Sequence, residues 1–437
     1  MSEKLRFKFL GATGEVERAS ILLSVNGNNL LLDYGIKLSK PPLFPLHVAP
    51  RDLDGIIVSH SHIDHIGGLP LLYVSGEMPI YMTPPSLSIS DLLIKDFLKI
   101  SGPLLPYEYF DFQTLMSKTI LVNYDEEFRV GETQIRAKMI NAGHIPGSAQ
   151  ILIETDSMRI LYTGDINYID THLLNAMEKE YGEVDIVITE STYGAEEHPN
   201  RKDLERKFVE SVTEVVENKG VALIPAFAVG RSQEILMILV ENGFKHKICI
   251  DGMAVEATKI ILEHPEYLRD AKKLQRAFRK AEIIERWRQR KSIIKEPCAI
   301  IAPAGMLGGG AAVFYLTKLY DDEKNGIFIV GFQVPGTPGR MLLEERKAII
   351  KGKVKRVKMR AEKYHFSSHI DKSGFKSLFS KIKGDPKFFV IHGNKENSNL
   401  LAKMLKEDLG FDTYLPKLGE EFEVDSHSVI RRGRTSI

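Results

Sequence analysis

The spacing of hydrophobic and polar positions predicts a β-rich start to the chain. Over residues 4–60 short apolar runs alternate with turns such as Asn26-Gly27, a pair that favours a hairpin. The continuous apolar run at residues 55–58 is typical of a buried strand. Helical periodicity extends from 67 to 99, and strand character returns over 120–140. We therefore expect a first domain built on β-sheet, with a helical stretch within it.

Helices and strands alternate in the middle of the chain. We expect a helix at 203–218 and strands at 221–224, 248–250, 298–302 and 326–331, with helices between the strands. This alternation is typical of a second α/β unit with a mainly parallel sheet.

Changes in this pattern suggest the domain boundaries. We expect residues 1–195 to form the first domain, 196–356 to form the second, and 357–425 to return to the first. Residues 426–437 are polar, basic and aperiodic, so we expect a flexible tail.

Composition narrows the functional classes. The 437 residues are 43% hydrophobic and 27% charged, with a net charge of +1, so a site for a polyanion must be local. Cys249 and Cys298 lie in apolar runs, which argues against a disulfide framework and favours a reducing cytoplasm. Pro303 and several glycines interrupt the uncharged stretch 298–316. We therefore expect no membrane span there and no membrane partner.

The most informative stretch is His60-Ser-His62-Ile-Asp64-His65, which follows the strand at 55–58. In extended backbone His60 and His62 project to the same side and can bind one divalent metal. Asp64 and His65 follow as the chain turns, and can face a second metal. Imidazole and carboxylate ligands without thiolate suit zinc in a catalytic site, and they are also compatible with manganese or iron.

Other strands end in residues of the same kind. His144 lies between glycine-flanked strands, and Asp165 ends the strand-like run 159–164. An aspartate between two metals can bridge them at the spacing of about 3.5–4 Å that phosphoryl displacement uses. The buried run 184–189 delivers Glu190, and a further strand ends at His392. His369 does not follow a strand so plainly, which suits a proton donor better than a metal ligand.

Two loops of the second unit are candidates for binding phosphate. Arg231 and Ser232 lie where a strand meets a helix, a junction that offers backbone N–H groups and a guanidinium. Gly308 and Gly309 lie in a second such turn, where glycine serves either close phosphate approach or tight packing.

Basic residues are concentrated in two stretches. Residues 269–291, which we expect to be a basic helix, contain ten Lys or Arg, with Phe278 and Trp287 among them, and residues 347–363 add eight more. Positive charge concentrated in this way is typical of proteins that bind a phosphodiester backbone.

The ordered set of motifs resembles the β-CASP branch of the metallo-β-lactamase superfamily. It comprises the first histidine cluster, His144, Asp165, Glu190-Ser-Thr-Tyr-Gly, Phe-Ser-Ser-His369 and Ile-His392-Gly. Within that branch the chain is most similar to the archaeal homologues of the cleavage and polyadenylation specificity factor nuclease. Larger archaeal members carry N-terminal KH domains, and this chain begins directly with the catalytic domain, as a short form would.

The resemblance implies an αββα metallo-β-lactamase sandwich with an inserted β-CASP α/β domain, and it implies a role for each residue. One Zn²⁺ would be held by His60, His62 and His144, a second by Asp64, His65 and His392, and Asp165 would bridge them. His369 and Glu190 match the family's acid pair. We expect these two residues to act in catalysis together with Asp64.

We therefore expect a zinc-dependent ribonuclease, with manganese as an alternative metal. It would hydrolyse single-stranded RNA to 5′-phosphate and 3′-hydroxyl ends in RNA processing or decay, as an endonuclease, a 5′-to-3′ exonuclease or both. The metals would supply an activated water at neutral pH and stabilise charge on the phosphate. We also expect a homodimer, membership of an RNA-processing complex and a cytoplasmic location.

Three alternatives stay open. A DNA nuclease of the same superfamily would carry the same motifs, and matched RNA and DNA strands would distinguish the two. A catalytically silent RNA-binding subunit would usually lack metal ligands, and none of the expected ligands is missing. A small-molecule hydrolase would leave the second domain and its basic stretches unexplained.

Overall fold

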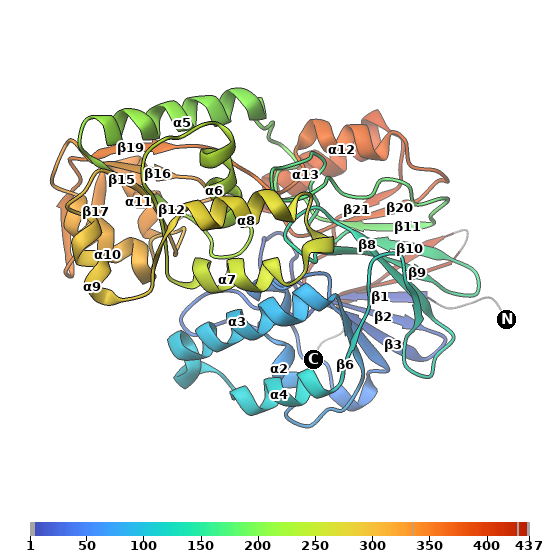
Figure 1. Cartoon of the computed structure of the whole chain (residues 1–437). Coiled ribbons are helices and arrows are strands. Elements are labelled where there is room, and N and C mark those ends of the chain that lie inside the picture. Colours follow the sequence, from blue (N-terminus) through green and yellow to red (C-terminus); the bar gives the residue numbers. More distant parts are fainter. Residues whose placement is uncertain (1–4, 335, 426–427, 435–437) are drawn as a thin grey trace. The chain divides into compact units, whose positions relative to one another are not determined.

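The structure, a computed structural model, describes residues 5–334, 336–425 and 428–434 (Figure 1). The chain divides into two compact units. The first holds the chain up to Asp170, then Ala176–Glu197, then the segment from Ser368 onwards. The second holds Thr171–Asn175 and His198–Ser367. The second unit is therefore an insertion in the first.

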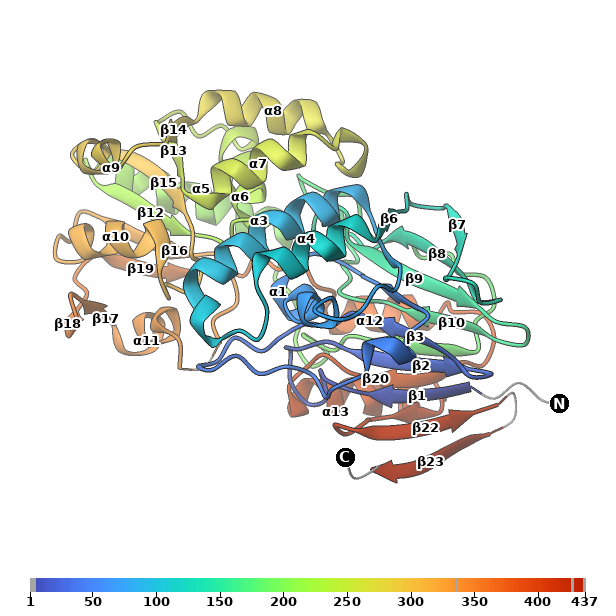
Figure 2. The ribbon, with the colours of Figure 1, turned by 90° about the horizontal axis from the view of Figure 1, so that it is seen from below.

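The first unit contains a sheet built from both ends of the chain. Its strand order is β23-β22-β1-β2-β3-β4-β5-β6. The strands are β1 (Leu5–Phe9), β2 (Ile21–Val25), β3 (Asn28–Leu32), β4 (Gly55–Ile57), β5 (Ile80–Met82), β6 (Thr119–Leu121), β22 (Glu420–Val424) and β23 (Val429–Arg434). Figure 2 shows the red strands β22 and β23 beside the blue β1. The C-terminal segment thus completes the first sheet.

A second sheet belongs to the same unit, in the order β21-β20-β11-β10-β9-β8-β7. Its strands are β7 (Glu127–Arg129), β8 (Arg136–Asn141), β9 (Ala149–Glu154), β10 (Arg159–Tyr162), β11 (Ile186–Thr189), β20 (Lys387–Val390) and β21 (Thr413–Tyr414). Strands β10, β11 and β20 run parallel, so the loops that follow them leave the sheet at one edge.

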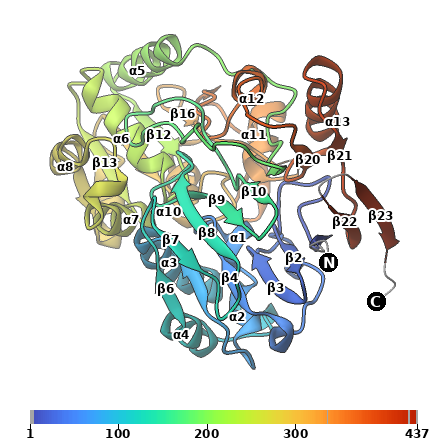
Figure 3. The same cartoon turned by 90° about the vertical axis from the view of Figure 1, so that its right-hand side faces the viewer.

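The two sheets pack face to face around an apolar core. Phe7 and Phe9 of β1 contact Phe389 of β20, with ring centroids 5.6 and 5.4 Å apart. Helices cover the outer faces: α1 to α4 pack on the first sheet and α12 and α13 on the second, the latter pair visible in Figure 3. Their bounds are α1 (Ile63–Ile66), α2 (Leu69–Leu72), α3 (Pro84–Ser101), α4 (Tyr109–Ser117), α12 (Lys372–Phe379) and α13 (Lys395–Lys403). This arrangement is the expected αββα sandwich.

The sequence of α3 explains where that helix begins and which face it buries. The Thr83 hydroxyl caps the helix by accepting the Ser86 N–H, and two prolines occupy the first turn, where their missing N–H groups cost nothing. Ile89, Ile94 and Phe97 are buried, which gives the helix one apolar face against the sheet.

The second unit is an α/β layer structure on an all-parallel sheet, ordered β14-β13-β15-β12-β16-β19. The strands are β12 (Val221–Pro225), β13 (Ile248–Asp251), β14 (Glu282–Ile284), β15 (Cys298–Ala302), β16 (Gly326–Ile329) and β19 (Arg360–Lys363). The central strands are buried throughout, which explains their unbroken apolar runs.

The remaining elements of this unit surround that sheet. They are α5 (Arg201–Glu217), α6 (Arg231–Glu241), α7 (Met253–Leu262), α8 (Ala271–Lys280), α9 (Trp287–Ile293), α10 (Gly310–Leu319), α11 (Pro338–Glu345) and the hairpin β17 (Lys347–Ile350) with β18 (Lys353–Arg356).

Three expectations differ from the structure. The return to the first unit comes after Ser367 rather than at 357, because β19 pairs with β16 and extends the second sheet. The basic stretch 269–291 is not one helix, since β14 pairs with β13 and separates α8 from α9. Within the expected tail, residues 429–434 form β23 on the edge of the first sheet; residues 426, 427 and 435–437 lie outside the described part.

The described helices include none with both the length and the apolar character needed to cross a bilayer.

Candidate metal centre

Most of the residues singled out as metal ligands or catalytic groups lie in loops that follow strands of the first unit. His60, His62, Asp64 and His65 follow β4. The others come from distant parts of the sequence: His144 follows β8, Asp165 follows β10, Glu190 follows β11, His369 precedes α12 and His392 follows β20. The fold brings their side chains into one buried cluster.

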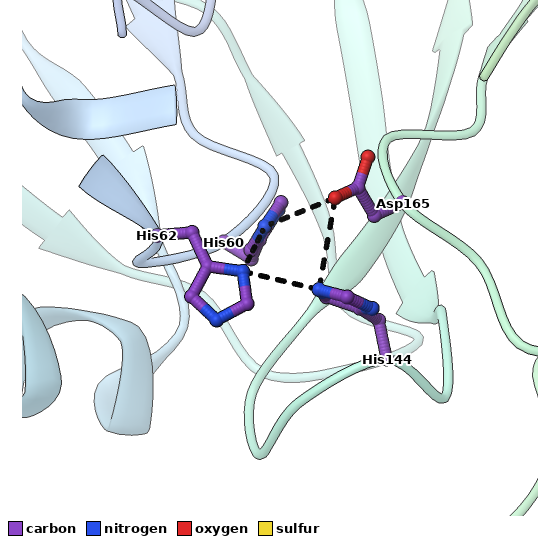
Figure 4. A group of neighbouring side chains, drawn as sticks. All are labelled: His60, His62, His144 and Asp165. Atoms are coloured by element: carbon purple, nitrogen blue, oxygen red, sulfur yellow. Dashed lines mark hydrogen bonds and ion pairs between the residues drawn. The ribbon is translucent and has the colours of Figure 1, made fainter. Parts of the chain in front are cut away.

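One group of side chains consists of His60, His62, His144 and Asp165 (Figure 4). The Nδ1 atom of His62 lies 3.2 Å from His60 Nε2 and 3.1 Å from His144 Nε2. Both Nε2 atoms lie 3.6 Å from Asp165 Oδ2. Two ligands at about 2.1 Å from a tetrahedral zinc would be roughly 3.4 Å apart, so these separations suit one shared metal ion.

A second group consists of Asp64, His65 and His392. His392 Nε2 lies 3.3 Å from His65 Nε2 and 3.5 Å from Asp64 Oδ2. The spacing of these three ligand atoms again matches that of atoms around one ion.

Asp165 lies between the two groups. Its Oδ2 faces His60 and His144, while its Oδ1 lies 3.6 Å from His65 Nε2 and 3.3 Å from His392 Nδ1. The Oδ1 atom is buried without a hydrogen bond, an arrangement that is costly unless a cation satisfies it. The donor set therefore fits two divalent metals with one carboxylate between them.

Burial sets the protonation of the first group. It lowers the pKa of His60 and His144 well below the ordinary value, with neighbouring imidazoles adding to the effect, and it lowers the pKa of His62 to about 4. These rings are therefore neutral near pH 7, which is the form that binds a metal.

Carboxylates reverse this effect in the second group. Burial alone would lower the pKa of His392, but Asp165 and Asp64 raise it to about 10. Burial would raise the pKa of Asp64, but His392 and His65 lower it. In this part of the cluster the histidines and carboxylates therefore favour each other's charged forms.

Asp33, at the end of β3, orients His65 and was missed by sequence reasoning. Its buried carboxylate accepts hydrogen bonds from the Ser59 N–H and hydroxyl and from the Tyr162 hydroxyl, each at 2.7 Å. His65 Nδ1 lies 2.8 Å from Asp33 Oδ2, which leaves Nε2 for a metal. The available signal was that Asp33 is a carboxylate directly after an apolar strand, much as Asp165 follows another.

His144 is oriented in the same manner, because its Nδ1 lies 2.8 Å from the backbone oxygen of Ser368. Only one ring nitrogen of His65 and of His144 therefore remains for a metal.

The backbone near His392 is tightly constrained. His392 has a φ of 48°, in the left-handed region that is uncommon for residues other than glycine. Its N–H donates to the Ala12 oxygen and its own oxygen accepts the Ser191 N–H. A side chain at Gly393 would place Cβ 2.2 Å from Ser191 Oγ, so this position requires glycine.

Glu190 and His369 form a pair beside the first group. His369 Nδ1 lies 3.1 Å from both Glu190 carboxylate oxygens, and the Ile166 N–H donates to Glu190 Oε1. The ring of His369 is 4.5 Å from that of His144, and its side chain is 20% exposed. Burial alone would lower the pKa of His369, but the Glu190 carboxylate raises it above the ordinary value.

The residues predicted to bind RNA all lie in the second unit. Ser232 is fully buried, and its hydroxyl donates to the Phe227 oxygen, so it is not presented to solvent. Arg231 is largely buried at the start of α6. Gly308 and Gly309 lie in the loop between β15 and α10, with open space where a side chain would project.

Family models match three segments of the chain. The metallo-beta-lactamase superfamily matches residues 13–184, the Beta-Casp domain matches 232–342, and a Zn-dependent metallo-hydrolase RNA specificity domain matches 354–416. Every ligand of the first group lies within the first match.

Similar proteins include three from archaea. RNase aCSPSF2 of Saccharolobus solfataricus is 37% identical over 95% of this chain and 85% of its own length. The probable RNase MJ4 of Methanocaldococcus jannaschii is 35% identical over 95% of this chain and 99% of its own length. The transcription termination factor FttA of the same organism is 34% identical over 94% of this chain and 70% of its own length.

A solved structure shares the fold. The crystal structure of a protein of unknown function from Enterococcus faecalis V583 aligns with a TM-score of 0.60 and 14% identity, over 96% of this chain and all of that one. The matched segments and the archaeal relatives show the family. The chain belongs to the β-CASP family of metallo-β-lactamase nucleases.

Proposed function

We propose that the chain is a metal-dependent ribonuclease that hydrolyses phosphodiester bonds of single-stranded RNA, leaving 5′-phosphate and 3′-hydroxyl ends. The observation that carries the proposal is the buried cluster in which Asp165 directs one carboxylate oxygen to each of two ligand groups. Relatives named as RNases, similar over nearly the whole chain, support RNA as the substrate.

We assign His60, His62 and His144 to one zinc ion and Asp64, His65 and His392 to another, with Asp165 shared. Ligands of this type bind manganese as well as zinc. Two divalent ions at this site would lower the pKa of a bound water and neutralise charge on the phosphate.

His369 is the proton donor in this proposal. Glu190 holds Nδ1, which orients the ring so that Nε2 can deliver a proton to the departing 3′ oxygen. Glu190 is itself held by the Ile166 and Thr192 N–H groups. It therefore acts as the residue that positions the acid.

The proposed ribonuclease activity also suggests a cellular role for the protein. We propose that the protein acts in RNA processing or decay in the cytoplasm, as a homodimer or within an RNA-processing complex. The buried thiols of Cys249 and Cys298 are free, which agrees with a reducing compartment.

Cleavage of RNA and DNA strands of one sequence tests the proposal. Single-stranded RNA labelled at its 3′ end is prepared with a 5′-monophosphate or a 5′-hydroxyl, beside DNA of the same sequence, and Asp64→Ala serves as the control. We expect metal-dependent cleavage of RNA that the variant loses. A ladder requiring the 5′-monophosphate would identify a 5′-to-3′ exonuclease, and internal cuts in both RNAs would identify an endonuclease. Preferred cleavage of DNA, or no cleavage, would overturn the proposal.

A further inference from the structure

Trp287 is a half-exposed aromatic residue on a basic helix, and the proposed chemistry does not use it. It is the only tryptophan in the chain, it begins α9 in the second unit, and its exposed fraction is 53%. Because burying so large a ring is favourable, a ligand that covers it would gain apolar contact.

Neighbouring side chains hold the Trp287 ring in place. Its centroid lies 4.5 Å from that of Phe314 on α10, and the Arg290 guanidinium lies 5.5 Å from the ring centre. Arg290 in turn donates two hydrogen bonds to the buried Asp251 carboxylate, at 2.7 and 2.8 Å, and the Tyr315 hydroxyl donates a third. A ring fixed in this way loses little conformational entropy when a ligand stacks on it.

Several exposed cations lie near Trp287 in the sequence. Lys291 lies one turn along α9 from Trp287, and Arg286, Arg288 and Lys295 are also exposed. Among the residues that the structure describes, none of these four side chains forms a salt bridge. On α8, Lys273 and Arg276 are paired with Glu241, whereas Lys272, Arg279 and Lys280 form no salt bridge within the described part of the chain. The positive charge around Trp287 is therefore available to an anion.

The position within the second unit also suits a ligand. Asp251 ends β13, and Phe314 lies one turn into α10, directly after the Gly308-Gly309-Gly310 loop that follows β15. Both features belong to the carboxyl edge of the parallel sheet, where open α/β folds bind their ligands.

We propose that Trp287 is a stacking site for an unpaired base of single-stranded RNA, with Arg286, Arg288, Lys291 and Lys295 contacting the adjoining phosphates. The inference rests on the proposed function for its choice of nucleic acid. An aromatic ring among cations is the usual means of binding single strands without reading sequence. A protein-binding surface would be depleted of lysine and would carry further apolar side chains, whereas Trp287 is the only large exposed hydrophobic residue between 285 and 296.

The single tryptophan allows a direct measurement in the full-length chain. The background is Asp64→Asn, which should prevent cleavage, and the ligand is a 12-nucleotide oligouridylate. We expect the RNA to quench tryptophan fluorescence, and Trp287→Ala to weaken binding of labelled RNA by about 5- to 100-fold. Trp287→Phe should retain most of the affinity, because it keeps a ring. Phe110→Ala, which removes a 72% exposed ring from the first unit, should leave the affinity unchanged.

Measuring RNA affinity at low and high salt separates the contribution of stacking from that of charge. The loss caused by Trp287→Ala should be similar at low and high salt, whereas Arg288→Ala with Lys291→Ala should reduce the salt dependence itself. Unchanged affinity of Trp287→Ala would overturn the inference, and a change in that variant's oligomeric mass would then identify the surface as a protein interface.

Cleavage by the otherwise native chain is measured in parallel with binding. Cleavage of RNA with no contribution from Trp287 to binding would refute only the stacking site. Trp287-dependent binding without cleavage would refute the ribonuclease assignment and leave the stacking site standing.

Discussion

His369 is the side chain whose role is most open to a direct test. It touches the first ligand group through its ring but is absent from both sets of metal ligands. His369→Ala should therefore leave bound metal unchanged and slow RNA cleavage by about 10² to 10⁴, the usual contribution of a general acid. Metal analysis and single-turnover rates check this. Equal rates for the variant and the native chain would remove His369 from the mechanism.

Asp33 illustrates how a residue outside the ligand set controls it. Asp33→Asn places an amide where His65, Ser59 and Tyr162 all present donors, and it should lower metal affinity by about 10- to 100-fold. Competition with a chelator measures the loss. The matched control is Asp52→Asn, a 60% exposed carboxylate, which should retain native affinity; similar values for both variants would contradict the role given to Asp33.

At the residue scale, the sequence alone was enough to name most of the side chains that the fold brings into one cluster. His60, Asp165 and His392 shared one signal, a polar side chain shortly after an apolar strand. Asp33 shared that signal too, but its importance depends on His65 and Tyr162, which lie 32 and 129 residues away. Contacts across such separations are properties of the fold and leave no local pattern.

At the level of elements, the turn from β20 into α13 also depends on a contact with a distant part of the chain. Gly393→Ala would place Cβ 2.2 Å from Ser191 Oγ and 2.6 Å from its backbone oxygen. We expect a cost of about 1–3 kcal/mol in stability, and we expect displacement of His392 to weaken one metal site. Gly102→Ala, whose Cβ would meet nothing within 4 Å, is the control. Native stability and metal content in Gly393→Ala would contradict this account.

The short segment Thr171–Asn175 belongs to the second unit although the chain on either side belongs to the first. Glu234 accepts the N–H groups of His172 and Leu173, and His172 Nε2 lies 2.9 Å from Glu205 Oε2. The hydrogen bond to Glu205 raises the pKa of His172. Burial would raise the pKa of Glu205, but His172 and Arg201 lower it to about 2.

These shifts set a pH window for stability. A raised histidine pKa stabilises the folded state fully below the unfolded value of about 6.5, and this contribution is lost as pH rises through the folded pKa. His172→Asn should therefore cost about 1–2 kcal/mol at pH 5.5 and less at pH 9. Urea unfolding followed by Trp287 fluorescence measures this within the second unit, with His246→Asn as the control. A cost that does not fall with rising pH would refute the ion pair.

Element prediction failed where pairing, rather than periodicity, decided the outcome. The basic stretch 269–291 was predicted to be one helix, but part of it forms β14, which pairs with β13. Strand β19 belongs to the second unit because it pairs with β16. The polar segment 429–434 forms a strand because the edge of β22 is available to it. Each partner is distant or depends on sheet order, which hydrophobic spacing does not encode.

At the scale of the whole molecule, segments near both ends of the chain build one sheet, and distant loops build one cluster of candidate metal ligands. The strand order of the first sheet requires the C-terminal β22 beside β1, and His392 reaches the centre from the same C-terminal segment. The family resemblance anticipated this return of the chain. Periodicity alone would not have done so, because an inserted unit and an appended one have the same local patterns.

The central claim is that the buried cluster is a two-metal centre that cleaves RNA. The most direct test removes all metal from the full-length chain, restores zinc in steps, and measures the initial rate of single-stranded RNA cleavage against bound zinc per chain, with Asp165→Ala alongside. We predict no cleavage without metal, full activity only as the second zinc binds, and an inactive variant. Cleavage by the stripped chain, or native rates in Asp165→Ala, would contradict the account.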